Sequence, residues 1–220
     1  MPRESGASSN HHVMDGAPIE ATWLLDRPLS RAMTRSSKTY SWTDPKMLFF
    51  DASGFAGGFV HPLLAPAHLL SLIGLGLLAG GASLRARLAI MAAFALGLAG
   101  GLGAIASGAG ETPANDMLFV AAGVCGATAA RGMPVSVWFV APAATIVGCA
   151  VGLDSPPDAV SLREAVWTLI GTGCGAVAAF ALMTGAAALI RWVGWHIALR
   201  VAGSWLAAIA MLVLALRWRG

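Results

Sequence analysis

The sequence predicts an all-α protein, a polytopic integral membrane helix bundle with about six transmembrane helices. Hydrophobic residues make up 57% of the 220 residues, and charged residues only 11%, where soluble domains carry about 25% charged residues. The apolar residues also form long continuous runs, and a helical span needs roughly 17–25 of them. A soluble fold of this size could not cover its surface with so little polar material. In a bilayer the shortage is required, because each central charge costs about 2.5–3.5 kcal/mol.

The charges divide the chain into two parts. Residues 1–47 are polar and rich in Ser and Arg, and they predict a flexible N-terminal tail. This tail has no apolar core of the roughly 7–15 residues that a secretory signal needs. Residues 48–220 hold the apolar runs and predict a six-helix transmembrane domain.

Six apolar runs follow one another in this domain. Because each run is continuously apolar rather than alternating, helices are favoured over barrel strands. The third run is short and is expected to borrow residues at its ends. The predicted spans are 55–80, 87–107, 116–131, 134–152, 165–190 and 192–216. The residues that separate them are Arg85 with Arg87, Glu111 to Asp116, Arg131 to Pro134, Asp154 to Glu164, and Arg191.

Glycines at four-residue spacing occur in several of these runs. Small residues at this spacing let helix backbones approach closely in lipid. The pattern therefore predicts a compact bundle, although such pairs are also common by chance in helices rich in Gly and Ala, and they indicate no activity. The pairs are Gly76 with Gly80, Gly97 with Gly101, and Gly171 with Gly175.

The positive charges favour two opposite orientations of the chain in the membrane. The basic short loops lie on the side opposite the termini, which places the termini outside the cytoplasm. The basic tail, together with Arg217 and Arg219, favours the reverse orientation. The short loops carry more weight in such counting.

Two histidines in the first span are candidate ligands, because polar groups inside a membrane are costly and often functional. His61 and His68 are seven residues apart, on one helix face, and roughly 10 Å apart along a straight helix. One metal ion could bridge them only if the helix breaks, and Pro62 and Pro66 can supply a break. Alternatively, both imidazoles bond backbone carbonyls that the prolines leave without donors.

The residues around these histidines resemble a known family. His61-Pro62 and His68-Leu69-Leu70 are similar to the ends of the HPxxGxDHLL signature in the first helix of HupE/UreJ proteins. These are small bacterial membrane proteins linked to hydrogenase and urease operons and regarded as nickel or cobalt permeases. Ala65 replaces the family's Gly, and Ala67 replaces its Asp.

A second resemblance lies in the fourth span. The stretch from Val147 to Pro156 is similar to the family's HGxAHGxExP signature. The Gly, Ala, Gly and Pro positions match, whereas both histidine positions are valine, at Val147 and Val151, and Asp154 stands at the Glu position. The resemblance covers about residues 48–217.

The resemblance implies nickel or cobalt as the transported ion, and the sequence indicates no certain cofactor. Imidazole and carboxylate ligands suit these ions, so His61, His68 and Asp154 are the candidate ligands. Cys149 lies between the two lost histidines and would favour softer ions such as copper(I) or zinc. Alternatively, Cys149 packs as a small hydrophobic residue.

Two functions are therefore expected from the sequence. The first is a HupE/UreJ-like divalent metal permease with an altered site, in the bacterial inner (cytoplasmic) membrane as a multi-pass protein. The alternative is a non-transporting structural or assembly subunit of a larger membrane complex. An enzyme is not expected, because the sequence contains no GxSxG, HExxH or GxxxxGK[ST] motif. The expected partners are the lipid bilayer, other membrane subunits or a second copy of the chain, and not nucleic acid.

Overall fold

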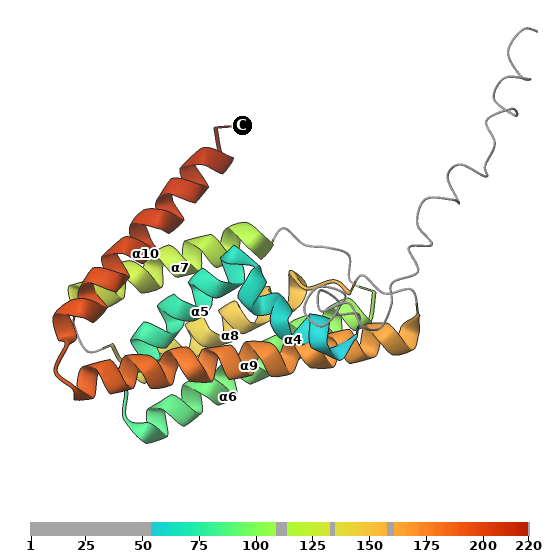
Figure 1. Ribbon diagram of the computed structural model, residues 1–220, viewed down its shortest axis with the longest axis horizontal. Helices are drawn as coiled ribbons and strands as arrows, with labels where there is room; N and C mark the ends of the chain where they lie inside the picture. Colours follow the sequence, from blue (N-terminus) through green and yellow to red (C-terminus); the bar gives the residue numbers. More distant parts are fainter. Residues whose placement is uncertain (1–53, 109–113, 133–134, 158–160, 220) are drawn as a thin grey trace, which may run out of the picture. The chain divides into compact units, whose positions relative to one another are not determined.

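The computed structural model of the protein describes residues 54–108, 114–132, 135–157 and 161–219. Within these residues the regular structure consists of seven helices and no strands (Figure 1). The all-α fold class is therefore confirmed. The tail predicted at residues 1–47 lies outside the described residues.

Five of the six predicted spans each form one helix, with ends within four residues of the prediction, while the first span forms two helices. Serine hydroxyls at Ser83, Ser136 and Ser161 accept backbone N–H groups at three of the helix starts, as N-cap residues commonly do. The helices are α4 (Phe55–Leu64), α5 (Pro66–Ala79), α6 (Leu84–Ala106), α7 (Ala114–Arg131), α8 (Val137–Leu153), α9 (Leu162–Trp192) and α10 (His196–Arg217).

The outer surface of the helices exposes more large apolar side chains than is usual for a surface in contact with water. Trp138 is 85% exposed and Phe139 is 79% exposed, and every helix except α5 carries further large apolar side chains that are exposed. Patches of this kind mark contact with lipid or protein. By length and composition, α6, α9 and α10 can each cross a membrane, and the bent pair α4–α5 passes the same test together, as a broken span or a re-entrant loop. The chain is thus a membrane protein, and the total of six spans stays a prediction.

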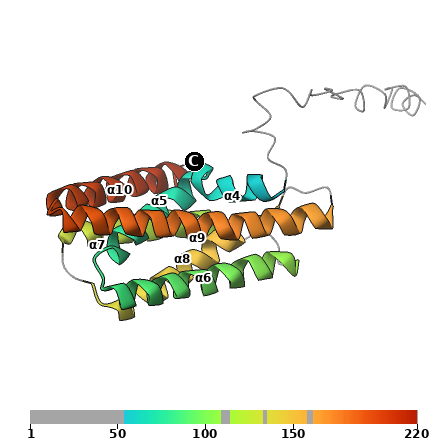
Figure 2. The same cartoon turned by 60° about the horizontal axis from the view of Figure 1, so that its bottom comes forward.

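The helices pack in pairs around α5, which contacts each of the other described helices. α4 and α5 both lie against α9, α6 packs along α8, and α7 packs along α10. Figure 2 shows α6 and α10 on opposite sides of α9. Leu72, Leu75, Phe94, Val147 and Phe180 are fully or almost fully buried between these helices, so α5 is enclosed by its neighbours.

The glycine pairs make the close helix contacts that the sequence predicts. A Cβ atom at Gly97 would collide with the Thr145 carbonyl oxygen of α8, and one at Gly171 would collide with the Phe55 carbonyl oxygen of α4. A Cβ atom at Gly76 would lie 2.7 Å from the Met183 Cβ of α9. Because backbone rather than flexible side chain meets backbone at the first two positions, these contacts fix the distances between the helices.

We expect Gly97→Ala to destabilise the bundle by about 1–3 kcal/mol, the usual cost of overpacking, because the added methyl group must push α6 away from α8. Gly100→Ala is the matched control, since nothing lies within 4 Å of a Cβ atom at Gly100 on the same helix. Thermal unfolding in detergent compares the two variants. Equal unfolding temperatures would show that the close approach of α6 and α8 is not needed.

Candidate functional site

The site begins at the break between α4 and α5, where the two helix axes differ by 70°. Pro66 has no N–H to continue the helical bonding of α4, and a residue that precedes proline is pushed out of the helical region. Ala65 accordingly has φ −79° and ψ 114°, an extended conformation. Pro66 then serves as the first residue of α5, a position that proline favours. The predicted break is therefore present at Ala65.

The break brings the two histidines together. His61 lies in the last turn of α4, and His68 lies in the first turn of α5. Their ring centroids are 5.4 Å apart, with an interplanar angle of 73°, so the rings meet edge to face. A straight helix would separate them by about 10 Å. Two imidazoles that bind one ion at about 2.1 Å have centroids about 5–6 Å apart, so the observed spacing suits a shared ion.

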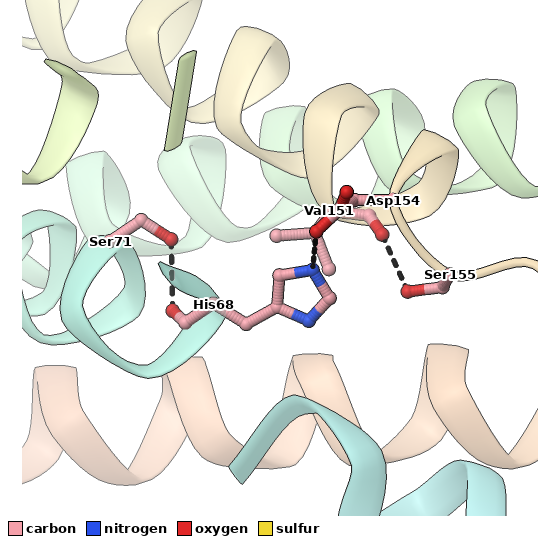
Figure 3. A network of polar contacts seen from close by, with 5 residues as sticks. All are labelled: His68, Ser71, Val151, Asp154 and Ser155. Atoms are coloured by element: carbon pink, nitrogen blue, oxygen red, sulfur yellow. Dashed lines mark hydrogen bonds and ion pairs between the residues drawn. The ribbon is translucent and has the colours of Figure 1, made fainter. Parts of the chain in front are cut away.

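His68 also contacts the end of α8. Its Nε2 lies 3.1 Å from Oδ2 of Asp154, the residue that follows α8 (Figure 3). The His68 side chain has no exposed surface, and the Asp154 side chain is 22% exposed. The contact therefore joins a fully buried imidazole to a carboxylate at the edge of the bundle, across 86 residues of chain.

Two serines stabilise the backbone on either side of this contact. The Ser71 hydroxyl donates to the His68 carbonyl oxygen at 2.8 Å, and the Ser155 hydroxyl donates to the Val151 carbonyl oxygen at 2.7 Å. Both serines are buried. Each serine hydroxyl thus bonds a backbone carbonyl within its own helical turn. The histidine side chains have no such bond to a nearby carbonyl.

The bond to Asp154 decides which nitrogen of His68 can bind a ligand. A neutral imidazole that donates from Nε2 to a carboxylate keeps its lone pair on Nδ1. Nδ1 of His68 and Nε2 of His61 are both buried without a hydrogen-bond partner. An unsatisfied buried polar atom costs about 1–3 kcal/mol, so two such atoms on adjacent rings indicate a place for a ligand. A carboxylate that holds the far nitrogen is the usual partner of a metal-binding histidine.

The site is incomplete as a metal cage. Within the described ranges, no group of three or more His, Cys, Asp or Glu side chains lies close enough together to hold an ion. Val147 and Val151, at the two histidine positions of the resembled signature, are 2% and 0% exposed. Figure 3 places the Val151 side chain beside the His68 ring. An apolar side chain therefore stands where the resemblance implies a ligand.

Cys149 does not join the histidines. It lies two residues before Val151, about 200° around α8 at 3.6 residues per turn. Its carbonyl oxygen packs against Gly101 of α6. The structure thus brings together His61, His68 and Asp154 from the predicted set, with Asp154 bonded to an imidazole.

Sequence reasoning did not pair His68 with Asp154 or assign roles to the two serines. The pairing joins the start of α5 to the end of α8, and the only sequence signal for it was that both residues belong to the two resembled signatures. Ser71 and Ser155 gave no signal, because a serine inside an apolar run usually bonds its own helix.

The chain was also compared with known proteins. A family model described as HupE / UreJ protein matches residues 44–213, which is more than three quarters of the chain. No curated protein and no solved structure shows significant similarity to the chain.

Proposed function

Because the chain belongs to the HupE/UreJ family, we propose that it is a permease for divalent nickel or cobalt, with His61 and His68 as the ligands of the passing ion. The carboxylate of Asp154 orients the His68 ring by accepting a hydrogen bond from its Nε2–H group. The protein acts as a transporter and not as an enzyme, in the inner membrane of a bacterium.

One observation carries this proposal. Two imidazole nitrogens, Nδ1 of His68 and Nε2 of His61, are buried and without a hydrogen-bond partner on rings that touch. Imidazole suits nickel and cobalt, and a bound ion would satisfy both nitrogens at once. Neither ring needs to leave its helix, because the break at Ala65 has already brought the rings together.

The small number of ligands suits transport. An ion that passes through must bind well enough to enter and weakly enough to leave. Two imidazoles from the protein would leave the remaining coordination positions to water, so the ion stays exchangeable. The apolar Val151 side chain beside His68 supports this reading, because it offers the ion no further ligand.

Uptake of nickel or cobalt into vesicles that contain the purified chain tests the proposal. We expect His61→Ala to lower uptake at least about tenfold, because the variant removes one of two ligands. His196→Ala is the matched control, since His196 is an exposed histidine at the start of α10. Uptake that His61→Ala leaves unchanged would contradict the assignment of the site.

The second candidate function is a non-transporting subunit that assembles with other membrane proteins. The buried Val147 and Val151, and the lack of a three-ligand group among the described residues, favour it. This function predicts that the wild-type chain binds neither ion and co-purifies with partners in mild detergent. Loss of those partners on removal of residues 1–47 would support it, whereas metal uptake by the chain alone would exclude it.

A further inference from the structure

Among the residues that the structure describes, one end of the bundle carries positive charge without any negative charge. There α5, α7 and α9 end, and α6, α8 and α10 begin. Neither the turns nor the neighbouring helix ends contain Asp or Glu, whereas Asp116 and Glu164 lie in the first turns of α7 and α9, at the other end of these helices. The arginines at this end are Arg85, Arg87, Arg131, Arg191 and Arg200.

Two of these arginines converge on the turn between α5 and α6. Arg87 donates from Nε to the Ala82 carbonyl oxygen at 2.8 Å and from Nη2 to the Gly80 carbonyl oxygen at 3.1 Å. Arg191, near the end of α9, donates from Nη2 to the Leu77 carbonyl oxygen at 3.3 Å. The Arg191 guanidinium carbon would lie 3.0 Å from a Cβ atom at Gly81. Both cations therefore lie at the same turn.

The end of α5 cannot balance these two charges. A helix C-terminus carries about half a negative charge, and a helix N-terminus carries about half a positive charge. α6 begins at this turn with Arg85 and Arg87 and has no acidic residue in its first turn, although acidic residues are the favourable choice there. The turn therefore keeps an excess of positive charge. A C-terminal cap for α5 requires one arginine and does not account for the others.

Unused donors remain at this turn. A guanidinium has five N–H groups, and only some of them are bonded to the carbonyl oxygens of Leu77, Gly80 and Ala82. Nε of Arg191 is buried without a hydrogen-bond partner. Gly81 is exposed, and because it has no side chain, it lies directly against the Arg191 guanidinium group.

The neighbouring tryptophans set the depth of the turn. Trp192 and Trp195, directly after Arg191, are 84% and 67% exposed, and exposed Trp at span ends lies at the level of the lipid headgroups. We propose that Arg87 and Arg191 bind the phosphate of an anionic phospholipid at the α5–α6 turn, with Arg85 at its rim. Guanidinium groups bind phosphate oxygens through paired N–H donors, and basic pockets between membrane helices suit acidic headgroups.

The number of phosphatidylglycerol molecules that the purified chain retains in mild detergent, measured by native mass spectrometry, tests this site. We expect Arg87→Gln and Arg191→Gln each to weaken retention about fivefold, the usual effect of one surface arginine. Retention of phosphatidylcholine should be low and equal in all variants. Arg219→Gln is the control, because Arg219 follows α10 at the opposite end of the bundle.

The outcomes are distinguishable. Circular dichroism of each variant establishes that the helices persist, and Arg191→Lys, which keeps the charge, should retain more lipid than Arg191→Gln. Equal retention by the wild type, Arg87→Gln and Arg191→Gln would overturn the site. Binding of inorganic phosphate in place of phosphatidylglycerol, lost in the same variants, would overturn the lipid as the occupant. This test is independent of metal transport.

Discussion

His68→Ala should abolish nickel and cobalt binding and stop uptake. His68 provides one of the two nitrogens proposed to face the ion, and it also holds the α8 end through the 3.1 Å contact with Asp154. The substitution therefore removes both a ligand and the hydrogen bond between His68 and Asp154. We expect no saturable uptake above that of empty vesicles, together with about 1–3 kcal/mol of lost stability from the buried contact. Uptake of radioactive nickel and thermal unfolding measure the two effects separately.

Asp154→Asn separates the ligand role of His68 from its orientation. The amide oxygen of the asparagine can still accept a hydrogen bond from the Nε2–H group of His68, but the negative charge of the carboxylate is lost. Because partners of metal-binding histidines change affinity by about 10–100-fold when they are altered, we expect binding to weaken without being lost. If Asp154→Asn abolished binding as fully as His68→Ala, Asp154 would be a direct ligand. Full uptake in both variants would contradict the assignment of His68 as a ligand of the passing ion.

The helices could be predicted from the sequence because lipid imposes simple demands. Apolar runs of span length, ended by arginines or by Pro and Gly, left little freedom for α6 to α10. The close contacts at Gly97 and Gly171 also followed from residue size alone. For the first span, the break could be predicted in the same way, but the geometry of the break could not. Pro62 and Pro66 predict a break, but they do not predict a bend of 70° or the ring separation of 5.4 Å.

The polar contacts could not be predicted, because they depend on how helices that are distant in sequence are placed. His68 meets Asp154 only because α5 is enclosed between α7, α8 and α9. Cys149 and Val151 are two residues apart, and the rotation of α8 decides which one faces His68. The bond from Arg191 to the Leu77 carbonyl oxygen likewise requires that α9 ends where α5 ends. A single sequence shows which residues could make such contacts, but it does not show which residues they contact.

The valine beside His68 provides the sharpest gain-of-function test of the site. Asp154 directly follows α8, three residues after Val151, so the two side chains lie on the same face. The Val151 side chain has no exposed surface and lies next to the His68 ring. A histidine at this position would come from α8, while His61 and His68 come from α4 and α5. The ion would then be held from two sides of the bundle.

We therefore expect Val151→His to tighten nickel binding by at least about tenfold, since even indirect partners of metal ligands have effects of this size. The larger ring costs about 1–3 kcal/mol of overpacking in the free protein, and bound metal should offset that loss. Isothermal titration of the purified chain with nickel measures the affinity, and the unfolding temperature with and without metal measures the coupling. Val151→Leu is the control, because it adds bulk without a ligand. If both variants bind nickel as the wild type does, a side chain at position 151 does not reach the ion that His61 and His68 bind.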